Sequence, residues 1–193
     1  MQKIHLIVNL LINGTLERFT RLVNRNKTVP RLMRFTIKEA DVFLEEIENL
    51  TKKERSALAR RIVSRYTNSK PVKSYKCGNY YWSASYTQGM IAVVISKNKV
   101  GIDIEKIVKK DLELFKISPR IRNWRTFYIV WTGIEAIIKT FNLNLRDYKK
   151  IVYQSHRGNK TTFLYDKKLI KIETLEQKGY CISICLKISS NTD

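Results

Sequence analysis

Two acidic residues separated by a single position, Asp103 and Glu105, are the first pair in the chain that suggests chemistry. In a β-strand, residues two apart point to the same face, so these carboxylates would project side by side. Adjacent negative charges repel unless a cation lies between them, and Mg²⁺ binds proteins through one or two carboxylates together with phosphate oxygens of a substrate. Acids are scarce in this chain and the flanking residues are basic, which favours a metal–phosphate site. A solvated strand face is the alternative, and it is the commoner meaning of such a pair taken alone.

Glu135 and Lys139 are a second candidate pair, four residues apart in a segment with helical periodicity. Residues at i and i+4 are neighbours on one stripe of a helix, and an ordinary helix salt bridge explains such a pair taken alone. Together with Asp103 and Glu105, however, they would complete a site. Glu135 could then bind a metal ion or accept a proton, and Lys139 could hold a phosphate.

Hydroxyl groups gather in a third segment, residues 83–89, where a predicted strand meets a turn. Hydroxyls and backbone N–H groups at such a bend can hold a phosphate. An ordinary hairpin turn is the alternative, and it is the commoner use of a segment of this kind.

Helical signals dominate the early chain, after an expected strand at 1–12. Residues 36–39 have the pattern of a capping box, which predicts a helix over 37–50. A second capping box at 51–54 predicts another helix, which runs to about Tyr66.

Strand signals dominate from residue 71 onward, because aromatic and β-branched side chains are frequent there. One predicted helix, 124–141, interrupts them. The expected strands are 80–85, 90–95, 100–105, 148–154, 161–165, 168–175 and 179–188. We therefore predict a mixed α+β protein of two similar lobes, 1–97 and 98–193, each a small sheet packed with helices. The lobes would be related by a pseudo-two-fold axis, with the site at their interface.

Net charge is the most unusual bulk property of the chain: 37 Lys and Arg against 17 Asp and Glu give +20 over 193 residues. Such an excess predicts a polyanionic partner. No apolar run approaches the about 18 residues that span a membrane, so we expect no membrane partner. Three cysteines without a CxxC pair, and only two histidines, argue against a disulfide scaffold, a zinc site or a histidine metal cluster. We expect a monomer in the cytoplasm.

The order of the candidate motifs resembles that of the 4′-phosphopantetheinyl transferases, specifically the two-lobed type that serves peptide and polyketide synthases. Residues 101–105 match the family pattern G-[IV]-D-[IV]-E, and residues 131–139 match most of W-[ST]-x-K-E-x-x-x-K. Residues 85–87 stand where the family has S-H-S, and residues 70–71 resemble its G-K-P segment. With 179–185, which resemble its closing strand, the similarity spans roughly 55–187. It implies a 4′-phosphopantetheinyl transferase-like fold.

The resemblance implies an enzyme that binds coenzyme A and Mg²⁺ and transfers the 4′-phosphopantetheine arm to a serine of an apo acyl or peptidyl carrier protein, which is acidic. The other product would be 3′,5′-ADP. The Mg²⁺ ligands implied are Asp103, Glu105 and Glu135. Glu135 would also help to deprotonate the serine and Lys139 would contact the phosphates, so these two would be catalytic. The further contacts to coenzyme A implied by the resemblance are Lys70, Ser85, Tyr86, Arg61 and Arg65.

The chain departs from the family pattern at three places. Tyr86 replaces the family histidine, and Ile134 replaces a lysine that faces phosphate. The stretch between Glu105 and Trp131, which helps to contact the carrier protein in relatives, is short. Three possibilities stay open: an active but diverged enzyme, one with an altered donor or acceptor, or an inactive relative that binds a carrier protein or coenzyme A.

A basic nucleic-acid-binding protein is the main alternative from a different class. Basic residues are interleaved with aromatic ones around Trp124, Tyr148 and Tyr153, and aromatic rings can stack on bases. No recognised nucleic-acid-reading motif occurs, however. A nuclease would need a lysine two residues after the strand acid, where Ile107 stands. We do not expect nucleic acid to be the partner.

Overall fold

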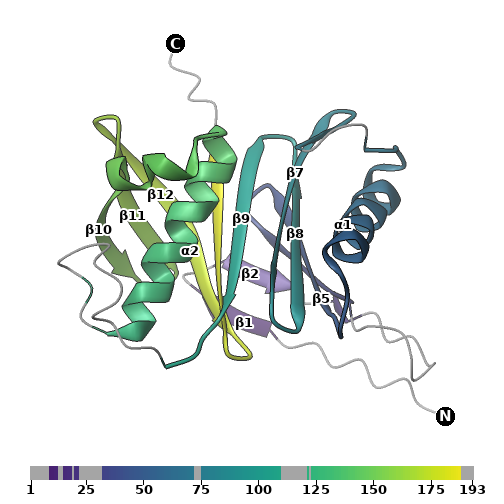
Figure 1. The fold of residues 1–193 in the computed structure, drawn as a ribbon, viewed down its shortest axis with the longest axis horizontal. Coiled ribbons are helices and arrows are strands. Elements are labelled where there is room, and N and C mark those ends of the chain that lie inside the picture. The colour runs from purple at the N-terminus through teal and green to yellow at the C-terminus, as the bar shows by residue number, and fades with distance from the viewer. Residues whose placement is uncertain are drawn as a thin grey trace.

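The computed structural model describes residues 32–71, 75–109, 121 and 123–187, together with the backbone of 9–12, 15–18 and 20–21. The described chain has the predicted mixed α+β architecture, with two large antiparallel sheets and two long helices (Figure 1). Neither of these helices, nor any other helix in the described ranges, is long and apolar enough to cross a membrane.

The first large sheet has the strand order β3-β4-β5-β8-β7-β6. Helix α1 (Lys52–Thr67) follows β5 in the chain, and a separate hairpin pairs β1 (Asn9–Ile12) with β2 (Thr15–Arg18). The strands of the sheet are β3 (Thr20–Arg21), β4 (Leu32–Ile37), β5 (Ala40–Glu46), β6 (Lys76–Cys77), β7 (Tyr80–Thr87) and β8 (Met90–Ser96).

The second large sheet has the strand order β10-β11-β12-β13-β9. The chain enters it after 97–98 and later forms helix α2 (Trp124–Phe141) and a 3₁₀ helix, η2 (Leu145–Lys150). Its strands are β9 (Lys99–Lys106), β10 (Val152–Arg157), β11 (Lys160–Tyr165), β12 (Lys168–Gln177) and β13 (Tyr180–Lys187).

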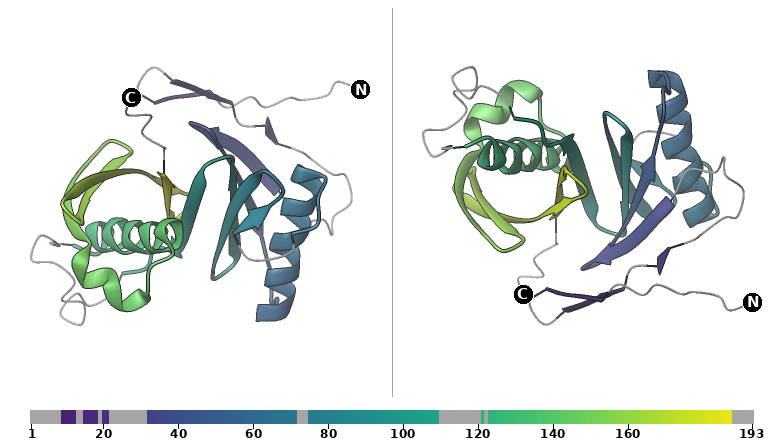
Figure 2. Two further views of the ribbon diagram at one scale, coloured as in Figure 1. Left: turned by 90° about the horizontal axis from the view of Figure 1, so that it is seen from above. Right: turned by 90° about the horizontal axis from the view of Figure 1, so that it is seen from below.

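The elements form layers. Helix α1 covers one face of the first sheet, the other face packs on β9 and β13, and the second sheet curves around α2 (Figure 2). Ile102 and Ile104 of β9 are fully buried in the core between the sheets. Because side chains alternate along a strand, Asp103 lies on the opposite face of β9, toward α2, as the sequence predicted.

The helix predicted over 37–50 is wrong, since the structure has the β4–β5 hairpin there. Lys38, inside the supposed capping box, has a left-handed φ of 53° and forms the turn of the hairpin. Strand β5 is buried on both faces: Val42 faces the core between the sheets and Phe43 faces α1. A strand buried on both faces has a continuous apolar run, and such a run also satisfies a helical template. The capping box at 51–54 is confirmed at the start of α1.

The bounds of some predicted elements differ from those in the structure. Residues 148–150 belong to η2, so the strand predicted over 148–154 begins only at Val152. His156 lies in β10, and a turn follows at 158–159. Of the strand expected at 1–12, residues 9–12 are strand and residues 1–8 lie outside the described residues. The helix predicted over 124–141 is confirmed with the same bounds.

Candidate active site

Asp103 and Lys139 form the centre of the candidate site. The Lys139 Nζ lies 2.7 Å from Asp103 Oδ1 and also donates to the Ile102 carbonyl oxygen at 3.1 Å. Asp103 is only 2% exposed, so this ion pair is largely shielded from water. Charge pairs in such surroundings interact far more strongly than pairs on the surface.

Strand β7 of the first sheet completes the surroundings of Asp103. Ser85 Oγ donates to Asp103 Oδ1 at 2.6 Å and accepts from Lys139 Nζ at 3.2 Å. Thr87 Oγ1, two residues further along, donates to Glu105 Oε2 at 3.3 Å. The site is therefore built from both sheets, and each acid of the strand pair has a hydroxyl partner on β7.

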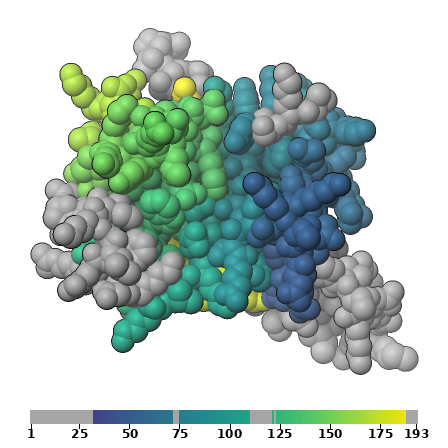
Figure 3. Space-filling view, in the orientation of Figure 1, coloured from purple at the N-terminus to yellow at the C-terminus, as the bar shows by residue number. Residues whose placement is uncertain are grey.

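The same face of β7 covers the free edge of β9. Ser83 Oγ accepts from the Ile102 backbone N–H at 3.3 Å, and Thr87 Oγ1 accepts from the Lys106 N–H at 3.2 Å. Edge N–H groups that lose water need another acceptor, and these hydroxyls provide it. Seen in space-filling view, the strands β7–β9 lie between the α2 and α1 regions (Figure 3).

Glu135 is the third acid of the site. Its Oε2 lies 3.7 Å from Lys139 Nζ, one turn along α2. Burial and the negative charge of Asp103 raise the pKa of Glu135 to about 7, although Lys139 opposes the shift. The proximity of the Asp103 carboxyl group and the charge of Glu105 contribute to this shift in the same direction. The three carboxylates therefore influence one another, and Glu135 is poised to exchange a proton near neutral pH.

Two glycines let α2 approach the second sheet closely enough to form this site. At Gly101, a Cβ would lie 2.6 Å from Thr140 Oγ1, and at Gly133 it would lie 2.5 Å from the Phe163 ring. Gly133 weakens an isolated helix, but here the missing side chain is what permits contact between α2 and β11. Glu135 and Lys139 consequently reach Asp103.

Two of the three predicted metal ligands, Asp103 and Glu135, lie side by side, but in the described chain no three acidic, histidine or cysteine side chains are arranged to hold a metal ion. Asp103 Oδ2 is buried and has no hydrogen-bond partner among the described residues. Glu135 lies beside it, close enough for the two negative charges to disfavour each other. Carboxylate oxygens are the ligands that Mg²⁺ prefers, and a divalent cation would relieve this repulsion.

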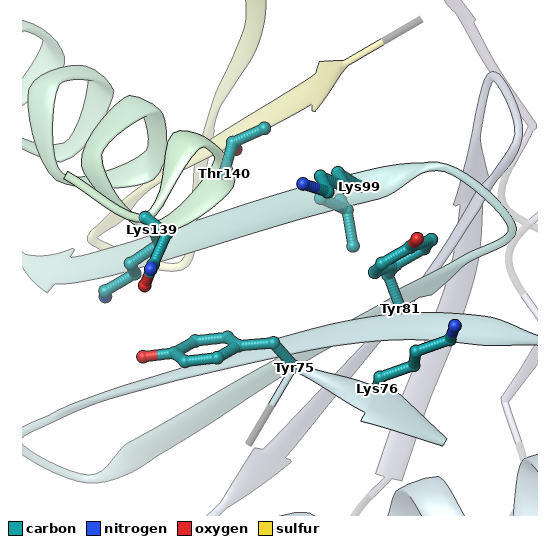
Figure 4. A pocket seen from close by; sticks show the side chains of 8 residues that line it. Tyr75, Lys76, Tyr81, Lys99, Lys139 and Thr140 are labelled. Atoms are coloured by element: carbon teal, nitrogen blue, oxygen red, sulfur yellow. The ribbon is translucent and has the colours of Figure 1, made fainter. Parts of the chain in front are cut away.

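A pocket of about 230 Å³ opens beside Lys139, between the end of α2 and strands β6, β7 and β9 (Figure 4). Lys76, Lys99 and Lys139 line it, and Tyr75 and Tyr81 supply two aromatic rings. Lysine side chains around one hollow favour an anionic ligand, although the Lys139 ammonium group is paired with Asp103 and that of Lys76 lies 5.8 Å from the centre of the Tyr81 ring. Of the pocket residues, only Lys139 was predicted as a site residue, because the others come from segments that only the fold brings together.

Of the predicted nucleotide contacts, the structure brings Ser85 into the site but not Tyr86. Residues 85 and 86 lie in strand β7 rather than in the turn, which comes at 88–89. Their side chains therefore point to opposite faces, and Tyr86 packs on the α1 side under the Arg55 guanidinium.

The predicted arginines of α1 lie elsewhere as well. Arg61 and Arg65 are exposed, and their charges act on Glu45 of β5, which faces α1. Lys70 is exposed just after α1, five residues before Tyr75 of the pocket. The site thus gathers Ser85, Lys139 and the three acids, while Tyr86, Arg61 and Arg65 are on the other side of the first sheet.

The aromatic residues that suggested nucleic-acid binding are not freely exposed. Trp124 is partly buried against the Phe127 end of α2, and Tyr148 and Tyr153 pack partly against its other half. Stacking on bases requires an accessible ring face, so these residues do not form an open stacking platform. Arg120 and Arg122 lie outside the described residues.

A scan against protein-family models and a search of curated proteins found no match to the chain.

Proposed function

We propose that the protein is a 4′-phosphopantetheinyl transferase, which moves the phosphopantetheine arm of coenzyme A to a serine of a carrier protein. One observation carries the proposal: three separated motifs converge on Asp103. Ser85 donates to it from β7, Lys139 forms an ion pair with it from α2, and Glu135 is close enough to couple to it. These motifs resemble those of the 4′-phosphopantetheinyl transferases, and their contact in space supports a shared site.

In the proposed reaction, the serine oxygen of the carrier protein attacks the phosphorus that bears the pantetheine arm. A new P–O bond forms, the pyrophosphate P–O bond breaks, and 3′,5′-ADP leaves with the bonding electron pair. Asp103, Glu105 and Glu135 would hold Mg²⁺, which neutralises charge on the pyrophosphate when bound.

The residues of the chain supply the remaining chemistry. Glu135 takes the serine proton, directly or through a water molecule, from its place beside Asp103 and Lys139. Lys139 turns its ammonium group to the phosphates and offsets the charge that develops on the leaving oxygens. Ser85 orients Lys139 and Asp103 from the opposite sheet.

The basic pocket is the proposed site for the phosphate-bearing end of coenzyme A. Lys76 and Lys99 would pair with its phosphates, and the rings of Tyr75 and Tyr81 would contact its flat or apolar parts. About 230 Å³ is less than a pocket that encloses a whole cofactor, so only one end of coenzyme A would be enclosed. Lys70 precedes this pocket in the chain and stays a proposed contact.

The partner proposed is an acidic carrier protein. A net charge of +20 favours both the phosphates of coenzyme A and an acidic protein surface, because complementary charges accelerate encounter and select partners.

A transfer assay tests the proposal. Fluorescently tagged coenzyme A, Mg²⁺ and a panel of apo carrier proteins are incubated with the protein, and label on each carrier is measured. We expect labelling by the native protein, a loss of at least about a hundredfold for Glu135→Gln, and little change for the matched variant Glu173→Gln, which lies on β12 and pairs with Lys38. Full labelling by Glu135→Gln would contradict the proposed role of Glu135, and a lack of labelling of every carrier by the native protein would count against transfer.

A further inference from the structure

The Lys139 ammonium group stands where a cation bound by Asp103 would be expected. It donates to Asp103 Oδ1 at 2.7 Å, to the Ile102 carbonyl oxygen at 3.1 Å and to Ser85 Oγ at 3.2 Å. An ammonium group has three donors, so all of them are used by these acceptors. Lys139 is thus held firmly in the acidic site and is not a solvated surface lysine.

The charges of the site nevertheless do not balance. Asp103, Glu105 and Glu135 can carry three negative charges, against one positive charge on Lys139. Asp103 Oδ2 is buried and accepts no hydrogen bond from any residue described in the structure. Buried carboxylate oxygens normally have partners, so this oxygen is open to a further cation.

We infer that Lys139 is a built-in counter-ion that competes with a divalent cation for Asp103, so that the cation binds tightly only when the ammonium group moves away. Both cations are attracted to the same carboxylate, and each repels the other strongly at this separation in partly buried surroundings. The identity of the anionic substrate rests on the proposed function. The competition between Lys139 and a cation depends only on the contacts of Lys139.

The direction in which Lys139 would move is given by the pocket. Lys139 already forms part of the pocket wall beside Thr140, with Lys99 and Lys76 around the same hollow (Figure 4). A phosphate bound there would attract the ammonium group away from Asp103. The metal ion and the anionic substrate would therefore bind cooperatively. The anion would draw the Lys139 ammonium group away from Asp103, and the metal ion would release that ammonium group for the anion.

Titration with Mn²⁺ alone, followed by electron paramagnetic resonance of the free ion, tests the competition without any substrate. We expect Lys139→Met to bind Mn²⁺ at least about tenfold more tightly than the native protein, because a repelling charge within about 4 Å is removed. The control Lys99→Met removes the same charge from the same pocket but has no contact with Asp103, and we expect a change of less than about twofold. Asp103→Asn should lose this binding.

Equal or weaker Mn²⁺ affinity for Lys139→Met would overturn the inference. So would an equal gain for Lys99→Met, which would show that only the total charge matters. If Lys139→Met does not fold, the native protein with ¹⁵N-labelled lysine side chains gives a second test. The slowly exchanging Lys139 ammonium signal, assigned with Lys139→Arg, should shift or exchange faster as Mg²⁺ is added, and an unchanged signal at saturating Mg²⁺ would overturn the inference.

The two proposals fail separately. If Lys139→Met gains Mn²⁺ affinity but the native protein labels no carrier protein, the counter-ion role stands and the transferase proposal is weakened. If transfer occurs but Lys139→Met gains no Mn²⁺ affinity, the transferase proposal stands and the counter-ion role is overturned.

Discussion

Gly101 in β9 lies directly against the carbonyl oxygen of Ala136 in α2: a Cβ at Gly101 would be 2.2 Å from that oxygen. The contact is backbone to backbone, so no side-chain rotation can relieve it. Because Asp103 follows two residues after Gly101 and Lys139 three residues after Ala136, this close approach sets the distance between the members of the ion pair.

We therefore expect Gly101→Ala to destabilise the fold by about 1–3 kcal/mol, the usual cost of forcing an extra methyl group into a packed core. The midpoint of denaturant unfolding measures it. The variant should also bind divalent cations more weakly, since α2 must move away from β9. Lys99→Ala, on the same strand but exposed, is the control. A variant as stable as the native protein would show that α2 does not depend on this contact.

Glu135 predicts an unusual dependence of stability on pH. Its pKa in the folded protein is about 7, above the ordinary value of 4.5, so the folded state holds a proton that the unfolded state has released between these values. Protonated Glu135 favours the folded state. Its contribution to the free energy of unfolding is fully present below about pH 4.5 and is lost as pH rises through 7. Relative to native protein, Glu135→Gln should thus gain stability between pH 5 and pH 8.

Thermal unfolding of both proteins at pH 5 and pH 8, without divalent cations, measures this difference. We expect the melting temperature of Glu135→Gln to exceed that of the native protein by a few degrees more at pH 8 than at pH 5, at about 2–4 °C for each kcal/mol. The same difference between the two proteins at both pH values would contradict the assigned pKa.

A chain of buried hydroxyls under α2 predicts the tautomer of His156. Thr132 Oγ1 donates to the Tyr128 carbonyl oxygen at 2.7 Å, so it must accept from Ser183 Oγ, 2.8 Å away. Ser183 Oγ has then used its hydrogen and accepts from Thr174 Oγ1 at 3.0 Å. Each hydroxyl has one hydrogen, so the direction of every later bond is fixed.

The chain ends at the imidazole ring. Thr161 Oγ1 donates to Thr174 Oγ1 at 2.9 Å, which leaves it only an acceptor for His156 Nδ1, also at 2.9 Å. Neutral His156 should therefore carry its proton on Nδ1, and burial lowers the pKa of His156 below 6.5, so the neutral form should dominate at pH 7.5. Two-bond ¹⁵N–¹H spectra report the tautomer. A neutral ring protonated on Nε2 would contradict the assigned directions of these hydrogen bonds. In Thr161→Val, His156 should lose its preference for the Nδ1-protonated tautomer.

The three cysteines should be unreactive in the folded protein. Cys77, Cys181 and Cys185 are all buried and free of disulfides. Burial raises the pKa of Cys181 and that of Cys185 to about 12, and only the thiolate is a good nucleophile. With a thiol reagent at pH 8, we expect less than about one-tenth of the labelling that unfolded protein shows at the same pH. Rapid labelling of the native protein would show that these packed surfaces open readily.

Secondary structure could be predicted from the sequence for segments that have one buried face or a distinctive spacing. Helix α2 has a strong apolar stripe, and the alternation of Ile102 and Ile104 with Asp103 and Glu105 identified both faces of β9. The prediction failed for β5, because a strand buried on both faces loses the alternation that separates it from a helix.

The candidate site shows the same limit. The acids and Lys139 could be found because their spacing within one strand or one helix is informative. The sequence could also have shown that Tyr86 does not face the site. Ser83, Ser85 and Thr87 alternate along one face of the strand, and Tyr86 falls between them on the opposite face. Lys76 and Lys99, however, belong to different strands, and only the packing of the two sheets places them around one pocket.

Isothermal titration calorimetry of coenzyme A with and without Mg²⁺ measures whether the protein binds this substrate through a metal ion. The native protein should bind coenzyme A at least about tenfold more tightly with Mg²⁺ than without it, because Asp103 and its neighbouring acids would hold the ion and the ion would offset the charge of the pyrophosphate. Asp103→Asn should lose that dependence, whereas Asp166→Asn, at the exposed 166–167 turn, should keep it. Folded native protein that binds no coenzyme A, or binds it equally with and without Mg²⁺, would contradict the account.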